Sequence, residues 1–171
     1  MTKNIALAGH AGSGKTTLCE ALLYQSGVTE RIGKITEGNT VSDYTAEEIK
    51  RKSSVYTTLS TIRTDALQVN LLDTPGMFDF AGEMTEGIYG SDCTLITVSG
   101  KSGVRVGTQK AYDCAVALGK PRMFVVTKLD DDNANFYNVL TDLKSKFGHG
   151  YTLNSKFKEP TDEEVQDIEE Q

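Results

Sequence analysis

Apolar residues along the chain fall into short runs of strand length. Residues 4–8 form one such run, and residues 93–99 and 122–127 form two more that are too apolar to belong to half-exposed strands. Residues 55–62 are rich in β-branched side chains, and together with residues 67–72 they predict a hairpin. The pattern therefore predicts three buried strands and one pair of antiparallel strands.

Between these strands, apolar residues recur at offsets of three and four, as on the buried face of a helix. One helix is predicted from about residue 17 to 26, and a second ends before Gly119 and Pro121. A third helix is predicted from about residue 135 to 147. The apolar stripe of this third helix consists of Phe136, Val139, Leu140, Leu143 and Phe147. Alternating strands and helices predict an α/β fold of three layers, with a mostly parallel central sheet, helices on both faces and a ligand site at the carboxyl ends of the strands.

The segment from Gly27 to Ser54 has scattered polar residues and no sustained period, so it predicts a long loop. Loops of this length are uncommon inside a compact domain. The segment is therefore expected to be functional or mobile.

A glycine-rich run, Gly-His-Ala-Gly-Ser-Gly-Lys-Thr, directly follows the first predicted strand and precedes the first predicted helix. Glycines let backbone N–H groups curl around phosphate oxygens, Lys15 is expected to reach the β and γ phosphates, and the Thr16 hydroxyl is expected to bind Mg²⁺. The predicted phosphate-binding residues are Gly9, His10, Ala11, Gly12, Ser13, Gly14, Lys15, Thr16 and Thr17. A glycine-rich run alone also fits an ordinary loop, but the order of strand, loop and helix favours a P-loop that binds a nucleoside triphosphate.

Composition narrows the class of protein. A chain of 171 residues, 38% of them hydrophobic, suits one globular domain, and its apolar runs are far shorter than the roughly 20 residues of a membrane span. No charged and then apolar leader opens the chain, so a cytoplasmic location without a membrane partner is expected. Cys19, Cys93 and Cys114 lie in apolar segments without metal-ligand spacing and predict reduced, buried thiols.

The net charge of −6 is concentrated in one segment, because residues 148–171 carry seven acids and two lysines. An acidic stretch with few apolar residues is usually solvated surface, so it predicts neither a metal site nor binding of nucleic acid, including sequence-specific DNA. Any contact with RNA would need a local basic patch, and residues 50–52 (Lys-Arg-Lys) form the clearest one.

A second polar motif, Asp-Thr-Pro-Gly at residues 73–76, ends the predicted strand 67–72. The Asp73 carboxylate is expected to hold the hydration shell of Mg²⁺, and the Gly76 N–H is expected to sense the γ-phosphate. The motif alone also fits a plain turn.

A third motif, Thr-Lys-Leu-Asp at residues 127–130, ends the strand 122–127. The Asp130 carboxylate can accept hydrogen bonds from N1–H and the exocyclic amine of guanine, a donor pair that adenine lacks. Lys128 can lay its aliphatic stem along the base plane, and Thr127 completes the predicted guanine-binding set. Because the three motifs come in this order at strand ends, GTP is favoured over ATP.

Four stretches of the chain carry a likeness to one family: residues 9–16, Gly-Asn-Thr-Val-Ser-Asp at 38–43, Asp-Thr-Pro-Gly followed by Phe-Asp-Phe at 78–80, and Lys-Leu-Asp at 128–130. From about residue 4 to 148 the chain resembles the GTP-binding domain of bacterial elongation factor G, and most closely the divergent elongation factor G-like paralogues. The resemblance implies a domain that binds GTP and Mg²⁺, docks on the ribosome and couples hydrolysis to movement or release. It also implies that segments 27–54 and 76–89 switch with the γ-phosphate.

The first switch of the family usually reads Arg-Gly-Ile-Thr, with the threonine hydroxyl closing over Mg²⁺, whereas residues 51–54 here read Arg-Lys-Ser-Ser. Ser54 keeps a hydroxyl at the matching position, so Thr16, Ser54 and Asp73 are the expected metal residues. Lys52 replaces the glycine, a change able to alter how the loop folds. In the alternative interpretation, Ser54 merely starts the next strand.

The family also places a histidine directly after Asp-Thr-Pro-Gly to orient the attacking water, and this chain has Met77 there. A thioether is a weak acceptor and cannot position water as an imidazole does, so intrinsic hydrolysis is expected to be slow. Lys15 and Gly76 remain the predicted catalytic residues. Asp79 is either a substitute for the histidine or a surface residue, and His10 is expected to shape the P-loop without acting as a base.

Two further departures concern the nucleotide pocket. Gly12 stands where the family has an aspartate, and Thr127 replaces an asparagine whose amide braces neighbouring loops, so a lower affinity is expected. The final guanine-contacting motif of the family is not visible after Phe147. The expected organisation is a GTP-binding domain over residues 1–147 that lacks this motif, followed by an acidic tail or a truncated remainder of the domain over residues 148–171.

The leading hypothesis is a Mg²⁺-dependent GTPase, slow in isolation, that acts as the nucleotide switch domain of an elongation factor G-like translation factor. Its expected partners are GTP, GDP and the ribosome. One alternative is a GTP/GDP-binding module with negligible hydrolysis, which Met77 supports. Another is a P-loop ATPase or small-molecule kinase, which only the P-loop supports.

Overall fold

The computed structural model describes residues 1–64 and 66–148, and five strands in this part of the chain form one sheet in the order β2-β3-β1-β4-β5. The strands are β1 Thr2–Gly9, β2 Thr58–Arg63, β3 Gln68–Asp73, β4 Cys93–Ser99 and β5 Arg122–Thr127. The central strand β1 pairs in parallel with β3 and β4, and β4 pairs in parallel with β5. Strand β2 joins β3 antiparallel at the edge of the sheet, so the predicted mostly parallel sheet and its hairpin are both confirmed.

Three of the five α-helices in the described residues were predicted from the sequence, and two were not. The helices are α1 Lys15–Gln25, α2 Ala46–Arg51, α3 Ala81–Tyr89, α4 Val106–Ala117 and α5 Phe136–Phe147, with 3₁₀ turns η1 Ile35–Glu37 and η2 Phe78–Phe80. Helix α2 lies in segment 27–54, so the prediction of one long loop there was wrong in part, and α3 lies in segment 76–89, for which the sequence predicted no helix. Helix α2 is too short to show a period, and a capping box defines its start, in which the Thr45 and Glu48 side chains each bond the other residue's backbone N–H.

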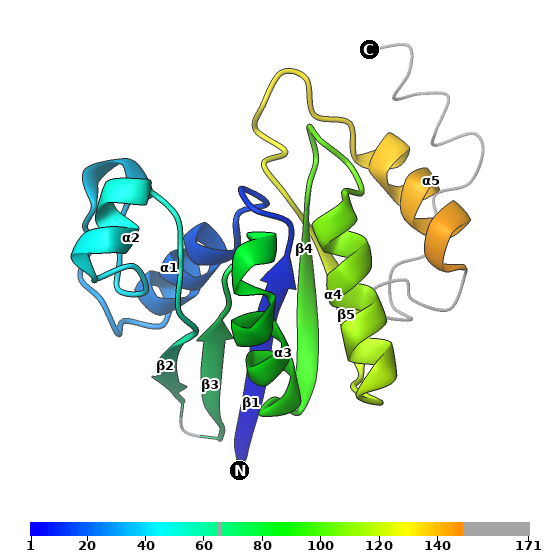
Figure 1. The fold of residues 1–171 in the computed structure, drawn as a ribbon. Helices are drawn as coiled ribbons and strands as arrows, with labels where there is room; N and C mark the ends of the chain where they lie inside the picture. Colours follow the sequence, from blue (N-terminus) through cyan, green and yellow to red (C-terminus); the bar gives the residue numbers. More distant parts are fainter. Residues whose placement is uncertain (65, 149–171) are drawn as a thin grey trace.

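Alternation along β1 divides the core between the two faces of the sheet. Ala6 and Ala8 belong to a cluster that side chains of α3, α4 and α5 complete, whereas Leu7 belongs to a second cluster with Cys19 and Leu23 of α1. Figure 1 shows α3 and α4 in front of the strands. The three layers predicted from the sequence are therefore present.

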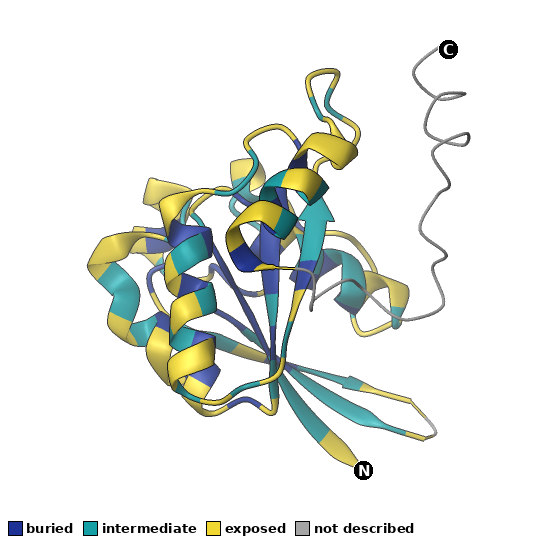
Figure 2. Ribbon diagram, turned by 90° about the vertical axis from the view of Figure 1, so that its right-hand side faces the viewer, coloured by how far each residue is buried: buried dark blue, intermediate teal, exposed yellow. Residues whose placement is uncertain are grey.

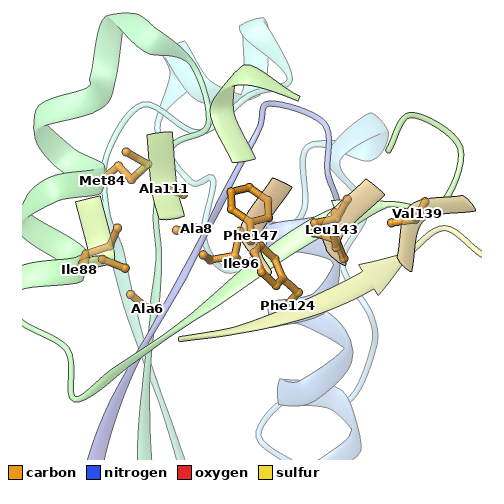
Figure 3. Packing of buried hydrophobic residues seen from close by; sticks show 12 residues of the cluster. Ala6, Ala8, Met84, Ile88, Ile96, Ala111, Phe124, Val139, Leu143 and Phe147 are labelled. Carbon is orange, nitrogen blue, oxygen red and sulfur yellow. The ribbon is translucent and has the colours of Figure 1, made fainter. Parts of the chain in front are cut away.

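The larger cluster is closed by aromatic side chains on β5, α4 and α5, as Figure 3 shows around Ile96. The Phe147 ring lies 5.0 Å from the Phe124 ring and 4.3 Å from the Tyr112 ring, measured between centroids. Phe147 comes from the predicted apolar stripe of α5, and stacking of this kind adds to the area that the rings bury. The stripe therefore fixes α5 beside β5.

Strand β5 is less buried than its sequence predicted. Phe124 is its buried residue, whereas Met123, on the opposite face, is 39% exposed. Met123 is exposed because β5 forms an edge of the sheet. On the face of the sheet opposite Phe124, α1 packs against β1 and β3. Figure 2 shows the buried residues gathered on the inner strands and on the helix faces that meet them.

The parallel strands bring the predicted motifs to one edge of the sheet. The loops that follow β1, β4 and β5 rise from the same upper end of the strands in Figure 1. The motif at residues 73–76 follows β3, which runs parallel to β1. Three motifs that are far apart in sequence therefore share one edge.

Two other expectations concern the whole chain. No helix in the described ranges is long and apolar enough to cross a membrane. The three cysteines are free; Cys19 is buried as predicted, whereas Cys93 and Cys114 are only partly buried. Apart from Gly148, the acidic segment 148–171 lies outside the described residues, as does the place where a last guanine-contacting motif would follow.

Candidate nucleotide-binding site

The P-loop forms a tight curl between β1 and α1, and Lys15 lies across it. The Lys15 ammonium donates hydrogen bonds to the backbone carbonyls of Gly9 (3.1 Å) and His10 (3.0 Å). Burial lowers the pKa of Lys15 to about 8, although the carboxylates of Asp73 and Asp43 oppose this shift. The loop thus curls around a buried lysine.

The floor of the P-loop is braced by hydroxyl groups from neighbouring strands. Ser13 Oγ lies 2.6 Å from Thr97 Oγ1 on β4, and both side chains are buried. The Thr127 hydroxyl at the end of β5 donates to the Ser13 carbonyl (2.7 Å). A side chain at Gly14, which has φ 88°, would come within 3.2 Å of that hydroxyl. Thr127 therefore braces the P-loop through its hydroxyl, although it lacks the amide of the asparagine that it replaces.

A cavity of about 430 Å³ opens beside the P-loop. It is lined by residues of three segments: Ala11, Gly12, Gly14, Lys15 and Thr16 of the P-loop, Ile35, Asp43, Arg51, Lys52, Ser53 and Ser54 of segment 27–54, and Gly76 and Met77. Segment 27–54, which the sequence marked as functional, thus forms one wall of the cavity. The basic patch at residues 50–52 contributes two of the lining side chains, and Arg51 forms an ion pair with Glu47.

Of the three expected metal residues, Thr16 and Ser54 line this cavity, whereas Asp73 is buried and does not line it. Thr16 Oγ1 and Ser54 Oγ are 3.2 Å apart, although 38 residues separate them in sequence. Ser54 precedes β2 by several residues, so its place is set by this contact and not by the start of a strand. Asp73 is 1% exposed, and burial raises its pKa to about 6, although the Thr16 hydroxyl and the Lys15 charge act in the opposite direction.

The donor set fits a magnesium ion. Both carboxylate oxygens of Asp73 are buried without a hydrogen-bond partner among the described residues. Such oxygens are costly to bury unless a cation or its waters satisfy them. In the described ranges, no group of three or more His, Cys, Asp or Glu side chains is placed to hold a metal ion. Hydroxyls and a few carboxylates suit Mg²⁺, which keeps several water ligands.

Gly76 lies directly against the P-loop. A Cβ atom at this position would clash with the Lys15 ammonium and with the backbone of Ala11, at 2.7 Å from its nitrogen. Only glycine allows this approach, which brings the Gly76 backbone to the part of the loop that Lys15 spans. The geometry is consistent with the predicted role of its N–H toward a γ-phosphate.

Met77 points its thioether toward the other switch segment. The Ser53 hydroxyl donates to Met77 Sδ at 3.4 Å, and the Met77 side chain is 38% exposed. Met77 therefore lines the cavity and bridges the two segments, but it offers a weak acceptor where an attacking water would need a strong one. Asp79, the other residue considered for this task, is exposed on η2 and does not line the cavity.

Lys52, which stands where the resembled family has a glycine, adopts a backbone conformation that usually favours glycine. It ends α2 with φ 55° and ψ 42°, in the left-handed region. The loop therefore keeps the turn despite the lysine, and Ser53 and Ser54 reach the cavity.

Segment 27–54 is tied to the rest of the molecule by buried carboxylates. Glu20 on α1 accepts hydrogen bonds from the backbone N–H groups of Gly33 (2.9 Å) and Val41 (2.6 Å). Glu48 on α2 accepts from the N–H groups of Val55 (3.0 Å) and Tyr56 (3.2 Å). Glu20 and Glu48 therefore hold the chain both before and after Ser54, one of the expected metal residues.

The predicted guanine-binding residues lie together but are open to solvent. Lys128, Leu129 and Asp130 are exposed on the turn after β5, and Lys128 has φ 57°. The neighbouring Asp131 pairs with Lys101 from the loop after β4 at 3.0 Å. This ion pair joins the loops that follow β4 and β5.

The remaining P-loop residues have different surroundings. His10 packs against Gly107 at the start of α4, with its ring 6.2 Å from that of Phe78. Burial, together with Lys15 and Arg105, lowers the pKa of His10 and so favours neutral imidazole. Thr17, also predicted to bind phosphate, is exposed and does not line the cavity.

Sequence reasoning missed three residues of the site. Asp43 lines the cavity, Thr97 supports Ser13, and Glu20 holds segment 27–54. Each acts through a contact between distant parts of the chain, which no local pattern reveals. For Asp43, the available signal was its place at the end of the Gly-Asn-Thr-Val-Ser-Asp stretch.

Comparison with known proteins agrees with this geometry. Residues 1–168 match the family model of the elongation factor Tu GTP binding domain. An elongation factor G-like protein of Mycobacterium tuberculosis is 40% identical over 146 residues, which are 85% of this chain and 20% of that protein. A mitochondrial ribosome-releasing factor 2 of Drosophila grimshawi is 35% identical over 144 residues, with shares of 84% and 20%. The chain spans about a fifth of the length of these curated relatives.

Solved structures give the same picture. A crystal structure of a Thermus thermophilus protein superimposes with a TM-score of 0.83 at 47% identity, covering 86% of this chain and 22% of that one. Translation elongation factor SelB of Methanococcus maripaludis, solved with the GTP analogue GppNHp, matches with a TM-score of 0.62 at 22% identity over 84% of this chain and 26% of that one. The second likeness concerns the fold alone.

Proposed function

Because the chain belongs to the elongation factor Tu GTP-binding domain family, we propose that it binds GTP with Mg²⁺ and hydrolyses it slowly, as the nucleotide switch domain of an elongation factor G-like translation factor. One observation carries the proposal. Thr16, Ser54 and Gly76, from three separate segments, meet around the buried Lys15 at one cavity. The GTPase domain of a translation factor requires this convergence of P-loop and switches.

The residues have separate tasks in the proposed reaction. The backbone of residues 9–16 and the Lys15 ammonium hold the phosphates and stabilise the charge that develops during transfer. Thr16, Ser54 and Asp73 would hold Mg²⁺, which when bound would neutralise phosphate charge. The close approach of Gly76 to Lys15 and Ala11 supports a role for its N–H as a donor to the γ-phosphate. Thr127, Lys128 and Asp130 read the guanine.

Met77 supports a second candidate function, a GTP/GDP-binding module with negligible hydrolysis. Its sulfur is occupied by the Ser53 hydroxyl and gives no strong acceptor for an attacking water. In single-turnover assays with purified ribosomes, we expect slow GTP cleavage that ribosomes stimulate in any longer polypeptide containing this chain. Negligible cleavage both with and without ribosomes would favour the binding module, and cleavage that ribosomes do not stimulate would contradict the translation-factor role.

Base specificity is tested separately on the 171-residue chain. In competition binding, GDP is expected to displace a fluorescent guanine nucleotide far better than ADP does. An Asp130→Asn variant is expected to lose this preference, since the amide cannot accept two hydrogen bonds in the same way. A preference for ADP in the unmodified chain would contradict the proposal and would favour the alternative interpretation of a P-loop ATPase.

The partners and location follow from the proposal. The ribosome is the expected macromolecular partner, and GTP and GDP are substrate and product. The cytoplasmic location expected from the sequence stays a prediction, since one of the matched relatives is a mitochondrial factor.

A further inference from the structure

The proposed reaction needs a group that orients a water molecule toward the γ-phosphate, because hydrolysis depends on attack in line with the bond that breaks. In the proposed function, Lys15 and Gly76 mark the γ-phosphate end of the cavity, and Met77 follows Gly76 as a further lining residue. The Met77 sulfur is only a weak acceptor. The group that orients the water is therefore to be sought among the neighbours of Met77.

Ser53 is a polar side chain of segment 27–54 that contacts Met77. Its hydroxyl donates to Met77 Sδ at 3.4 Å and lies 3.5 Å from the Ser54 carbonyl, which competes for the same proton. Ser53 lines the cavity together with Gly76 and Met77. A serine hydroxyl thus stands beside the proposed position of the γ-phosphate.

The Ser53 oxygen keeps its capacity to accept hydrogen bonds. A hydroxyl group has one proton to donate and two lone pairs with which to accept. The proton goes to the Met77 sulfur or to the Ser54 carbonyl, and no group in the described part of the chain donates to Ser53 Oγ. The oxygen can therefore accept a hydrogen bond from a water molecule in the cavity.

Other polar side chains that line the cavity are less suited to this task. Arg51 and Lys52 can only donate hydrogen bonds. Thr16 and Ser54 are expected metal residues, and their hydroxyls lie 3.2 Å from each other. Asp43 is a strong acceptor, but its carboxylate is buried beside Ser54. Each of these groups is therefore either unable to accept or placed beside the metal residues.

The backbone around Ser53 is held on both sides by Glu48. The Ser53 N–H donates to the Glu48 carbonyl at 3.2 Å, and the Val55 N–H donates to the Glu48 carboxylate at 3.0 Å. Between them, the Ser54 hydroxyl contacts Thr16 on α1. Since these contacts fix the main chain, the Ser53 hydroxyl can orient a water molecule with little further loss of conformational freedom.

We propose that Ser53 is the positioning residue for the attacking water and that Met77 orients its hydroxyl. The inference rests on the proposed function and deepens it by assigning the contact to the water. The water oxygen bonds to the γ-phosphorus while the bond from that phosphorus to the β–γ bridging oxygen breaks. One water proton passes to a γ-phosphate oxygen, so GDP and phosphate leave and Ser53 keeps its own proton. A hydroxyl is a weaker acceptor than an imidazole, which agrees with slow hydrolysis.

The first test compares single-turnover GTP cleavage with GTP affinity in the 171-residue chain. For Ser53→Ala, the cleavage rate is expected to fall about fivefold to tenfold, the effect of one hydrogen bond, while the GTP dissociation constant changes less than about twofold. Ser53→Thr keeps the hydroxyl and should cleave GTP within about threefold of the unmodified rate. The matched control is Ser145→Ala on α5, an exposed serine that donates to the Asp142 carbonyl, and it should change neither quantity.

The variant Met77→Leu separates orientation of the water from support of the loop. Leucine fills similar space without a sulfur atom, so the loop is kept while the Ser53 hydroxyl loses one acceptor. Adding Ser53→Ala to Met77→Leu is expected to lower cleavage about fivefold further, because the water still loses its contact. If the added substitution has no effect, Ser53 serves only to hold Met77 and the inference is wrong.

Two further results would overturn the inference: unchanged cleavage by Ser53→Ala, or equal losses of cleavage and GTP affinity in that variant. The second result would mean that Ser53 only supports the shape of the cavity. Absence of GTP binding or of cleavage by the unmodified chain is a different result, which contradicts the proposed function itself.

A second measurement does not depend on a variant or on a rate. The unmodified chain is crystallised with Mg²⁺ and a nonhydrolysable GTP analogue, and the water in line with the γ-phosphorus is located. Ser53 Oγ is expected within about 3.2 Å of this water. A water in that place held by Asp43 or by a backbone carbonyl, without Ser53, would contradict the assignment.

Discussion

The Thr127 hydroxyl donates a 2.7 Å hydrogen bond to the backbone carbonyl of Ser13, although 114 residues separate the two. This bond joins the end of β5, where the guanine-binding turn begins, to the floor of the P-loop. Ser13 is held from the other side by Thr97. The base and phosphate ends of the proposed nucleotide site are thus connected through one buried serine.

Thr127→Val is expected to weaken GDP binding roughly fivefold, because a buried hydrogen bond contributes about 1 kcal/mol and the P-loop loses its brace. Isothermal titration calorimetry on the 171-residue chain measures the change. Thr127→Ser keeps the hydroxyl and should bind nearly as well as the unmodified chain. Equal weakening in both variants would show that the methyl group matters and the hydrogen bond does not.

The sequence predicted the features that depend on local pattern. The five strands, helices α1, α4 and α5 and the P-loop all have the period or motif that identified them. Helix α2 is only six residues long, which is too short to show a helical period. The partial exposure of β5 was not predicted, because a run of apolar residues does not reveal that a strand lies at the edge of the sheet. Asp43 could not be assigned because its role depends on being brought beside Thr16 and Ser54.

Lys52→Gly is expected to stabilise the chain by about 1 kcal/mol, because a left-handed backbone strains any residue with a Cβ atom. Urea denaturation measures the free energy of unfolding. Lys50→Gly, inside α2, should have the opposite sign and a similar size, since glycine is a poor helix former. Destabilisation by Lys52→Gly would mean that the lysine side chain has contacts worth more than the strain.

Glu20→Gln is expected to destabilise the chain by about 2 kcal/mol, because it replaces a charged acceptor of two backbone N–H groups with an amide that has only one acceptor oxygen. Hydrogen exchange of the Gly33 and Val41 amides should accelerate. The amides of β4 should keep their rates relative to global unfolding. Unchanged exchange at Gly33 and Val41 would contradict the assignment of Glu20 as the anchor of this segment.

Glu48 is expected to contribute to acid unfolding. Burial alone would raise the pKa of Glu48, but hydrogen bonds from Val55, Thr45 and Tyr56 hold it below its ordinary value. A carboxyl with a lowered folded pKa stabilises the fold above its unfolded pKa of about 4.3, and this contribution is lost as the pH falls through the folded pKa.

Glu48→Gln should therefore be less stable than the unmodified chain at neutral pH, by about 2 kcal/mol, and the difference should shrink below about pH 4. Stability curves from pH 3 to 7 give the comparison. A difference that stays constant with pH would mean that the ionised form of Glu48 is not the stabilising one.

Gly76→Ala separates nucleotide binding from cleavage. The new methyl group would meet the Lys15 ammonium and the Ala11 backbone, so residues 76–80 must move away from the P-loop. Single-turnover GTP cleavage is expected to fall about 10²-fold, since the backbone N–H no longer reaches the γ-phosphate, whereas GDP affinity should change little. Gly82→Ala is the matched control, because a Cβ atom there meets nothing within 4 Å and alanine favours the helix. Equal cleavage rates in the two variants would show that close approach of Gly76 is not required for hydrolysis.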